Sequence, residues 1–230
     1  MKYFKVGGCV RDYLLGQDVK DIDLVAIGGS FDDLSHDVVA KGGKIFVSKP
    51  EYLTIRCKLP DIGPCDIRLA RKDGDYSDCR RPDQVFVAED IKDDVLSRDF
   101  TINALLQDIE TGEVVDYVGG QQDIIDRVIR CVGAPEERIR EDALRIMRAI
   151  RFSVTKGFVL DYALDYVLKD EKFVRLLEKI SPERIYEELF KMFRFDTLSS
   201  WRCLNEYELI RNAVFGNDFG IWLMPTMKKV

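Results

Sequence analysis

Two stretches near the N-terminus decide the fold: Val6-Gly7-Gly8-Cys9-Val10-Arg11-Asp12 and, shortly after it, Asp21-Ile22-Asp23-Leu24-Val25. The first stretch predicts a short apolar strand that ends at Val6, followed by a glycine turn and a helix. Gly7 and Gly8 lack the Cβ atoms that would keep a ligand from the backbone, and the start of a helix offers unpaired N–H groups and a partial positive charge. A turn of this kind can bind phosphate.

The second stretch places two acidic residues in an apolar run. Asp21 and Asp23 alternate with Ile22 and Leu24, and on a strand this spacing puts both carboxylates on one face and the apolar side chains on the other. Two carboxylates provide oxygen ligands of the kind that Mg²⁺ takes alongside substrate phosphates. Each stretch alone also occurs in ordinary turns and on solvated surfaces, but their succession indicates a site for phosphate and metal.

Composition limits the class of protein. The 230 residues are 46% hydrophobic and 33% charged, which is typical of a globular chain with one large or two small domains. No apolar run reaches membrane-spanning length, so we expect no membrane partner. The net charge of −6 argues against a generally basic surface, and any contact with nucleic acid must then be a local patch.

Cysteine and histidine usage excludes two kinds of metal chemistry. The six cysteines show no C-x-x-C spacing, so neither a zinc site nor a redox pair is expected. The single histidine, His36, lies in a polar helical stretch, which excludes a His-rich metal centre. No signal-peptide pattern opens the chain, and we expect reduced thiols in a cytoplasmic protein.

Residues 1 to about 135 predict an α/β arrangement. Ser30 is expected to cap a helix that ends near Ala40, and two strands are expected at 52–58 and 65–70. Asp66 lies between apolar neighbours in the second of these strands. It is either a third carboxylate brought beside Asp21 and Asp23 by strand pairing or a carboxylate on the solvent face of an edge strand.

Three further features complete the first domain. Residues 72–83, rich in Asp and Arg, predict a mobile loop. Arg98 and Asp99 lie in an apolar context and indicate a structured charged pair, although a plain surface or interdomain salt bridge would look the same. After them we expect a strand at 113–116, a helix and a short strand at 128–132.

The remaining chain predicts helices. A helix over 135–152 would carry four polar residues at successive i, i+3 steps, and these would form a single stripe: Asp142, Arg145, Arg148 and Arg151. The stripe is either a salt-bridge ladder on a solvated face or a binding surface. Ser181-Pro182 marks another helix start, a further helix is expected at about 198–214, and residues 215–230 have no regular pattern.

Five motifs in this order resemble the class II tRNA nucleotidyltransferases, the CCA-adding enzymes, which share these motifs with bacterial poly(A) polymerases of the polymerase-β-like superfamily. The motifs are Gly7-Gly8-x-x-Arg11-Asp12, Asp21-x-Asp23, Arg98-Asp99-Phe100-Thr101-Ile102-Asn103-Ala104, Glu141-Asp142-x-x-Arg145 and Ser181-Pro182-Glu183-Arg184-Ile185. The resemblance covers residues 1 to about 190. It implies an α+β fold with a nucleotidyltransferase head (1–135, a mixed β-sheet with flanking helices) and an all-α neck with a truncated body (136–230).

The resemblance also implies roles for head residues. Asp21 and Asp23 would hold two Mg²⁺ ions, and Asp66 would help to activate the primer 3′-hydroxyl, which fits a phosphoryl transfer driven by positioning and charge neutralisation. Gly8 and Arg11 would contact triphosphate and ribose. Arg98 corresponds to the second arginine of the family's Arg-Arg-Asp motif, whereas the first is replaced by Ser97, which leaves the contact of that first arginine in doubt.

In the neck, Asp142 and Arg145 correspond to the family's protein template for the incoming base. A carboxylate accepts from the exocyclic amine of cytosine or adenine, and a guanidinium donates to the adjacent ring acceptor. Uracil and guanine present a carbonyl to the carboxylate, so the pair would admit CTP and ATP and reject UTP and GTP. Arg148 and Arg151 would contact the triphosphate or stabilise the pair.

The implied function is Mg²⁺-dependent addition or repair of the 3′-terminal CCA of tRNA from CTP and ATP. Two alternatives stay open. One is a poly(A) polymerase or a partial C- or A-adding enzyme, and the other is a catalytically silent nucleotide- or RNA-binding module, against which the presence of all three carboxylates argues. Because the chain stops soon after the neck, we expect the RNA-gripping body to be reduced or absent, and homodimerisation is a further open alternative.

Overall fold

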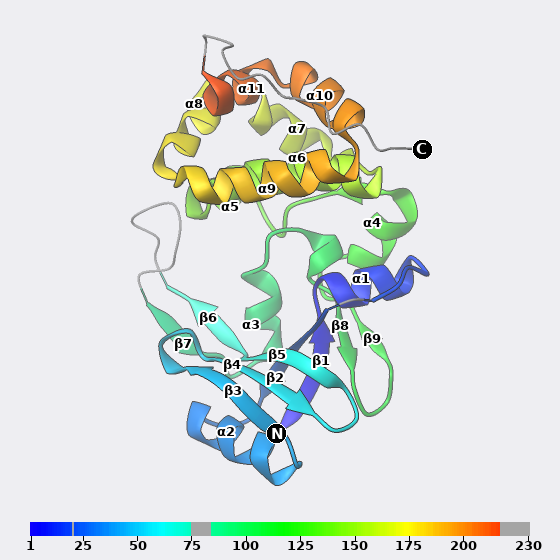
Figure 1. Cartoon of the computed structure of the whole chain (residues 1–230), viewed down its shortest axis with the longest axis vertical. Helices are drawn as coiled ribbons and strands as arrows, with labels where there is room; N and C mark the ends of the chain where they lie inside the picture. The colour runs from blue at the N-terminus through cyan, green and yellow to red at the C-terminus, as the bar shows by residue number, and fades with distance from the viewer. Residues whose placement is uncertain (20, 75–83, 217–230) are drawn as a thin grey trace. The chain divides into compact units, whose positions relative to one another are not determined.

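The computed structural model describes residues 1–19, 21–74 and 84–216, and the described chain has the predicted α+β fold. It divides into two compact units, the first formed by described residues up to Asp126 and the second by 127–216 (Figure 1). The predicted boundary at residue 135 lies later than this division. The short strand β10 (Val128–Ile129) pairs in parallel with β11 (Val159–Leu160), and both strands belong to the second unit.

A seven-stranded sheet with the order β3-β4-β5-β2-β1-β8-β9 forms the frame of unit 1. Its strands are β1 (Lys2–Val6), β2 (Ile22–Ile27), β3 (Lys44–Lys49), β4 (Thr54–Leu59), β5 (Gly63–Leu69), β8 (Leu106–Asp108) and β9 (Val114–Val115). The pairing of β2 with β5 is parallel and the other described pairings of this sheet are antiparallel. The sheet is therefore mixed, as predicted.

Helix α2 (Phe31–Ala40) covers one face of the sheet, with Leu34 and Val38 buried against it (Figure 1). The helix begins at Ser30, whose side chain forms a capping box with Asp33, so the predicted start is confirmed. Apolar side chains of alternate residues on the central strands fill this interface: Leu24, Ala26, Ile55, Cys57, Leu59, Cys65, Ile67 and Leu69. Because strand side chains alternate between faces, the residues between these point to the opposite face.

The other elements of unit 1 are α1 (Gly8–Leu14), the 3₁₀ turn η1 (Pro50–Tyr52), β6 (Arg71–Asp73), β7 (Val85–Val87), α3 (Ile91–Leu96), the 3₁₀ turn η2 (Thr101–Asn103) and α4 (Gly120–Asp126). Strand β6 pairs with β7, so the predicted loop over 72–83 is wrong at its start, because backbone pairing orders Lys72 despite its polar side chain. Residues 75–83 lie outside the described part of the chain. Strand β3 was not predicted, since its mostly exposed residues show no alternating burial.

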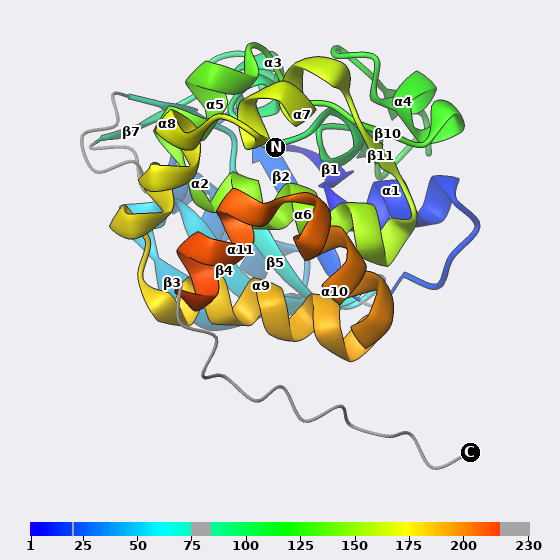
Figure 2. The same ribbon diagram turned by 90° about the horizontal axis from the view of Figure 1, so that it is seen from above.

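Unit 2 consists mainly of helices: α5 (Pro135–Glu141), α6 (Leu144–Lys156), α7 (Tyr162–Leu168), α8 (Glu171–Val174), the 3₁₀ segment η3 (Arg175–Lys179), α9 (Pro182–Phe195), α10 (Thr197–Glu206) and α11 (Glu208–Phe215). Helices α9 and α10 both pack on α6, and α11 packs on α10 (Figure 2). The start of α9 after Ser181 agrees with the prediction. None of the described helices has the length and apolar character needed to cross a membrane.

Two predicted helices are each broken in the structure. The helix expected over 135–152 stops at Asp142, whose backbone is extended (φ −141°, ψ 102°). Oδ1 of Asp142 accepts the N–H of Leu144 at 3.0 Å, and its carbonyl oxygen accepts the N–H of Arg145 at 3.0 Å, so the residue ends α5 and starts α6. The helix expected over 198–214 is interrupted at Tyr207, between α10 and α11.

Candidate active site

Strand register brings two of the predicted carboxylates together. Asp23 on β2 and Asp66 on β5 are direct partners in the parallel pairing, and residues paired in this way point to the same face of the sheet. This is the face opposite α2. Strand β5 lies between β4 and β2, so the interpretation of Asp66 as an edge-strand residue is wrong. Asp21 lies two residues before Asp23, immediately ahead of β2.

The carboxylates create a local negative charge. Asp23 is open to solvent at the surface, yet the surrounding protein atoms partly desolvate its carboxyl, and this, together with the charges of Asp66 and Asp21, raises its pKa. The positive charges of Arg98 and Arg68 act in the opposite direction but do not prevail. A raised carboxyl pKa at an accessible position is the electrostatic signature of a site that favours a cation.

The donor set suits a cation that is shared with a ligand. Within the described ranges, no three His, Cys, Asp or Glu side chains gather closely enough to hold a metal ion. Mg²⁺ commonly binds to one or two carboxylates and completes its coordination with water and substrate phosphates. Asp21 and Asp23 fit this arrangement, whereas a site built from protein ligands alone would not. Asp66 is also engaged by Arg56, whose Nε lies 3.4 Å from its Oδ1.

Two arginines share one buried carboxylate in unit 1. Asp94, on α3, is fully buried. Its Oδ1 accepts from Nη2 of Arg68 at 2.8 Å, and its Oδ2 accepts from Nη2 and Nε of Arg98 at 2.7 and 3.1 Å. Burial alone would raise the pKa of Asp94, but the two guanidiniums lower it below its usual range. The predicted charged group at Arg98 is therefore structured, with Asp94 as the acidic residue that accepts its hydrogen bonds.

Asp99 has a different role. Its Oδ1 accepts from the backbone N–H of Phe100 at 2.7 Å and from the side-chain amide of Asn103 at 3.1 Å. Oδ1 of Asn103 in turn accepts from Nη1 of Arg11 at 2.5 Å, and Nε of Arg11 donates to Asp12 at 2.9 Å. Arg11 is 5% exposed. It thus joins α1 to η2 inside the protein, and its predicted contact with a nucleotide remains a prediction.

The glycine turn lies at the other end of this network. Gly7 precedes α1 with φ 76° and ψ −134°, a backbone conformation that residues other than glycine rarely adopt. A Cβ atom on Gly7 would lie 3.7 Å from Nη1 of Arg98, and one on Gly8 would lie 3.4 Å from Nη2 of Arg11. The turn therefore brings the backbone of Gly7 next to the guanidinium of Arg98, while the following residue, Gly8, is partly exposed.

In unit 2 each residue of the predicted base-recognition pair has a polar partner in the protein. Nη1 of Arg145 donates to Oε2 of Glu141 at 2.8 Å and to the carbonyl of Arg138 at 2.9 Å, while Asp142 pairs with Nη2 of Arg184 at 3.2 Å. The single helical stripe is wrong at its first member, because Asp142 lies at the break between α5 and α6 and outside the helix that carries Arg145. Arg145 is also 6% exposed, so a fully solvated ladder is excluded.

The last residues of the stripe hold helices together. Nε of Arg151 lies 2.5 Å from Oε2 of Glu188, a residue of α9 that is 4% exposed. Arg148 and Arg151 both lie over the ring of Phe152, at 5.5 and 4.0 Å from its centroid. The structure thus uses Arg151 to join α6 and α9, and its predicted contact with nucleotide remains a prediction.

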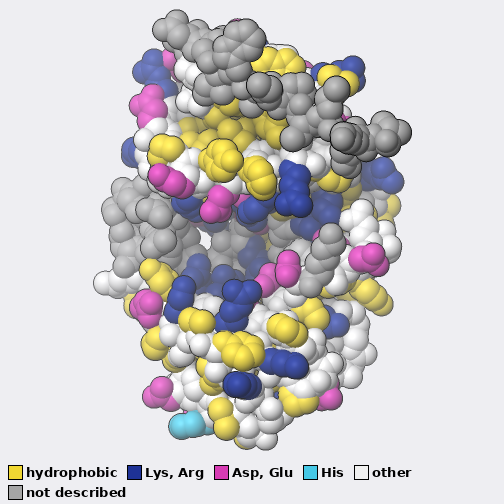
Figure 3. All heavy atoms as spheres, in the orientation of Figure 1, with side chains coloured by type: hydrophobic (Ala, Val, Ile, Leu, Met, Phe, Trp, Pro, Cys, Tyr) yellow, Lys and Arg dark blue, Asp and Glu magenta, His cyan; other side chains and the backbone are white. Residues whose placement is uncertain are grey.

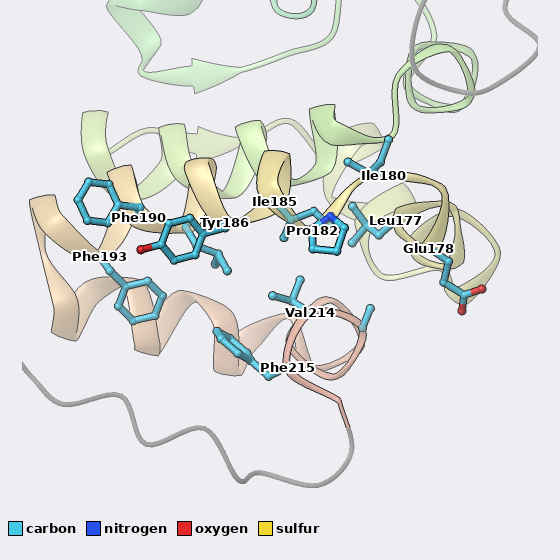
Figure 4. A pocket seen from close by; sticks show the side chains of 12 residues that line it. Leu177, Glu178, Ile180, Pro182, Ile185, Tyr186, Phe190, Phe193, Val214 and Phe215 are labelled. Carbon is cyan, nitrogen blue, oxygen red and sulfur yellow. The ribbon is translucent and has the colours of Figure 1, made fainter.

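An apolar pocket of about 680 Å³ lies among η3, α9 and the end of α11 (Figure 4). Its lining includes Leu177, Ile185, Phe190 and Phe215, and Glu178 is the one charged residue among the described residues that line it. Hydrophobic side chains also gather on the surface of unit 2 (Figure 3). The described part of this lining offers no basic side chain to a triphosphate, so the charged clusters described above are the better candidates.

Sequence reasoning missed three partners of the candidate site residues. Asp94 precedes Arg98 by four residues on a helix, a spacing that could have indicated the pair. Arg68 follows Asp66 by two residues on a strand and so faces the same side. Glu188 carries no local signal, since its partner Arg151 lies 37 residues away in the sequence.

Family models and curated relatives relate this chain to the same group of proteins. The poly A polymerase head domain family matches residues 3–130, and a family described as the probable RNA and SrmB-binding site of polymerase A matches residues 171–213. The CCA-adding enzyme of Bacillus pumilus is 41% identical over 194 residues, which are 84% of this chain and 46% of the relative. The CCA-adding enzyme of Staphylococcus saprophyticus is 37% identical over 220 residues, which are 95% of this chain and 53% of that relative. The chain thus spans about half the length of the curated relatives it matches.

Solved structures agree. The Bacillus stearothermophilus CCA-adding enzyme in complex with CTP aligns with a TM-score of 0.77 at 32% identity, over 90% of this chain and 48% of that one. The Thermotoga maritima CCA-adding enzyme complexed with tRNA aligns with a TM-score of 0.77 at 27% identity, over 96% of this chain and 50% of that one. With the head-domain match spanning more than half of its residues, this chain belongs to the poly A polymerase head domain family, together with the CCA-adding enzymes.

Proposed function

We propose that this chain catalyses Mg²⁺-dependent nucleotidyl transfer, and that it adds or repairs the 3′-terminal CCA of tRNA from CTP and ATP in the cytoplasm. The observation that carries this proposal is the in-register pair of Asp23 and Asp66 within electrostatic reach of the guanidiniums of Arg68 and Arg98. Carboxylates for a metal next to cations for phosphates are the two components that phosphoryl transfer requires. The similarity to CCA-adding enzymes supports the choice of substrates.

Asp21 and Asp23 are the proposed ligands of the metal. Two bound Mg²⁺ ions would neutralise phosphate charge and align the attacking and leaving oxygens. The open position of Asp23 gives a triphosphate access to its carboxylate. Asp66, on the neighbouring strand, is the proposed acceptor for the proton of the primer 3′-hydroxyl.

The phosphates of the nucleotide would meet the glycine turn and Arg98. Asp94 fixes the Arg98 guanidinium through two hydrogen bonds to one oxygen, which leaves Nη1 facing Gly7. Such a fixed donor loses little freedom when it binds an anion. Gly8, which has no side chain to obstruct the approach, would contact the triphosphate through its backbone.

Base choice is proposed to depend on Asp142 and Arg145, each held by its own partner. Glu141 orients Arg145, and Arg184 orients Asp142. The carboxylate of Asp142 would accept from the exocyclic amine of cytosine or adenine, and Arg145 would donate to the ring nitrogen beside it. A carbonyl in place of the amine would leave two acceptors facing each other, which costs on the order of 1–3 kcal/mol when buried.

The second candidate is a poly(A) polymerase, favoured by the description of the matching head family. The test uses purified protein, Mg²⁺, each labelled nucleoside triphosphate in turn, and tRNA ending at the discriminator base, at CC or at CCA. CCA addition predicts that CTP is incorporated first and that ATP is incorporated once, onto the CC end. Repeated ATP incorporation onto tRNA ending in CCA would favour the polymerase, and no incorporation at all would reject both.

A further inference from the structure

Arg68 shares the buried carboxylate of Asp94 with Arg98, although none of the five motifs includes it. Its Nη2 lies 2.8 Å from Oδ1 of Asp94, and Nη2 of Arg98 lies 2.7 Å from Oδ2. One carboxylate therefore holds both guanidiniums. Because Asp94 is fully buried on α3, water cannot replace either partner without entering the protein interior.

Arg68 is directed by strand geometry toward the candidate site. It follows Asp66 by two residues on β5, and its partner across the pairing is Val25, two residues after Asp23. All four residues thus lie on the face of the sheet opposite α2. The charge of Arg68 also opposes the upward shift in the pKa of Asp23, so the two side chains are within electrostatic reach of each other.

The pair of arginines carries more positive charge than its carboxylate neutralises. The Arg68 side chain is 28% exposed and that of Arg98 is 14% exposed. An anion placed against the exposed parts of these two side chains would meet the positive charge that Asp94 alone does not neutralise.

Ser97 occupies the position where the resembling motif has its first arginine. Its hydroxyl donates to the carbonyl of Asp94 at 2.8 Å, at the end of α3, and adds no charge. We propose that Arg68 is the second phosphate-binding arginine of the site and that it supplies, from β5, the guanidinium that position 97 lacks. This inference rests on the proposed function, because its ligand is the triphosphate chain of the incoming nucleotide.

The experiment measures two ligands by calorimetry in the presence of Mg²⁺: CTP and inorganic pyrophosphate, which contains only the phosphate part. In Arg68→Gln we expect both dissociation constants to rise by about tenfold or more, as for loss of a charge-assisted hydrogen bond. The matched control is Arg175→Gln, which removes an exposed arginine paired with Glu171 in unit 2 and should leave both constants unchanged.

A rescue variant separates phosphate binding from support of Asp94. Arg68→Gln combined with Ser97→Arg restores a guanidinium beside the site without restoring the ion pair from β5, and we expect it to recover most of the lost affinity. Arg68→Lys keeps the charge against Asp94 but removes the forked donors, and we expect a loss of several fold for both ligands. If the melting temperature of Arg68→Gln is too low for binding measurements, Arg68→Lys takes its place in the experiment.

Three results would count against the inference in distinguishable ways. Wild-type affinity in Arg68→Gln and Arg68→Lys, together with a loss in Arg98→Gln, would overturn the role of Arg68 and leave the proposed function intact. Failure of Ser97→Arg to recover any affinity in a folded double variant would overturn the replacement of position 97. A wild-type chain that binds neither CTP nor pyrophosphate would overturn the proposed function itself.

Discussion

Strand register fixes the acidic residues of the candidate site in unit 1, whereas ion pairs between and within helices fix the polar residues of unit 2. Asp23 and Asp66 face each other because β2 and β5 pair, and their like charges gain nothing from the proximity. Arg151 and Glu188 are adjacent because they attract each other across α6 and α9. The proximity of Asp23 and Asp66 thus opposes folding, while the ion pair of Arg151 with Glu188 supports it.

The largest effect is expected from Asp23→Asn. Loss of a metal ligand should reduce CTP incorporation by about 10³-fold or more, because a bound metal contributes several kcal/mol of transition-state stabilisation. The melting temperature without Mg²⁺ should stay equal or rise, since a repelling charge is removed. The control is Asp61→Asn, an exposed residue in the turn between β4 and β5. Near-normal turnover in Asp23→Asn would contradict the assignment of the metal site.

Glu188→Gln should lower the stability of the fold, whereas Asp23→Asn should not. Removing the carboxylate leaves the Arg151 guanidinium without its charged partner in a mostly buried position, which costs on the order of 3 kcal/mol of folding free energy. Urea unfolding measures this loss. The comparison of the two units requires that Glu188→Gln destabilises while Asp23→Asn does not. If both variants changed the free energy of unfolding by the same amount and in the same direction, this contrast between the two units would be wrong.

A smaller effect is expected on base choice. Asp142→Ala should raise incorporation of UTP relative to CTP by roughly tenfold to a hundredfold, because it removes the acceptor that rejects a carbonyl. Glu141→Gln should mainly weaken incorporation of all four nucleotides, because it loosens the ion pair that orients Arg145. Competition between labelled nucleotides checks both. Unchanged selectivity in Asp142→Ala would return this residue to a purely structural role with Arg184.

The smallest expected effect is a pH dependence of stability. The folded state raises the pKa of Asp23 above its unfolded value of about 3.9, so the protonated form favours folding. Its contribution is complete below that unfolded value and is lost as the pH rises through the folded pKa. Unfolding free energies of the wild type, measured relative to Asp23→Asn, should therefore fall with rising pH in the absence of Mg²⁺. A flat difference would mean that Asp23 is not electrostatically strained.

Sequence reasoning succeeded where a local rule determines the structure. The glycine turn, the capped helix after Ser30 and the face of the sheet that carries Asp23 follow from spacing alone, because strand and helix periodicity act over a few residues. The partnership of Asp23 with Asp66 required the additional assumption that β2 and β5 are neighbours. The structure confirms that assumption.

The failures occurred where a side chain overrides the local pattern. Asp142 fits a helical stripe by spacing, but its carboxylate binds the backbone of the next turn and breaks the helix. The expected continuous helix was therefore wrong, while the joint role of Asp142 and Arg145 in base choice stays a prediction. Strand β3 was missed because an edge strand with exposed residues carries no burial pattern. Glu188 could not be assigned, since its partner is set by the packing of two helices and not by spacing along the chain.

The parallel pairing of β2 with β5 also has a consequence for how the protein folds. Asp23 and Asp66 become neighbours only after the intervening chain, which holds α2, β3 and β4, has closed into place. Closing a loop of this length costs entropy before any long-range contact can repay it, and such contacts form slowly. Capacity to bind Mg²⁺ should therefore return late in refolding, after the helical signal of α2, so that metal affinity reports the completion of the sheet.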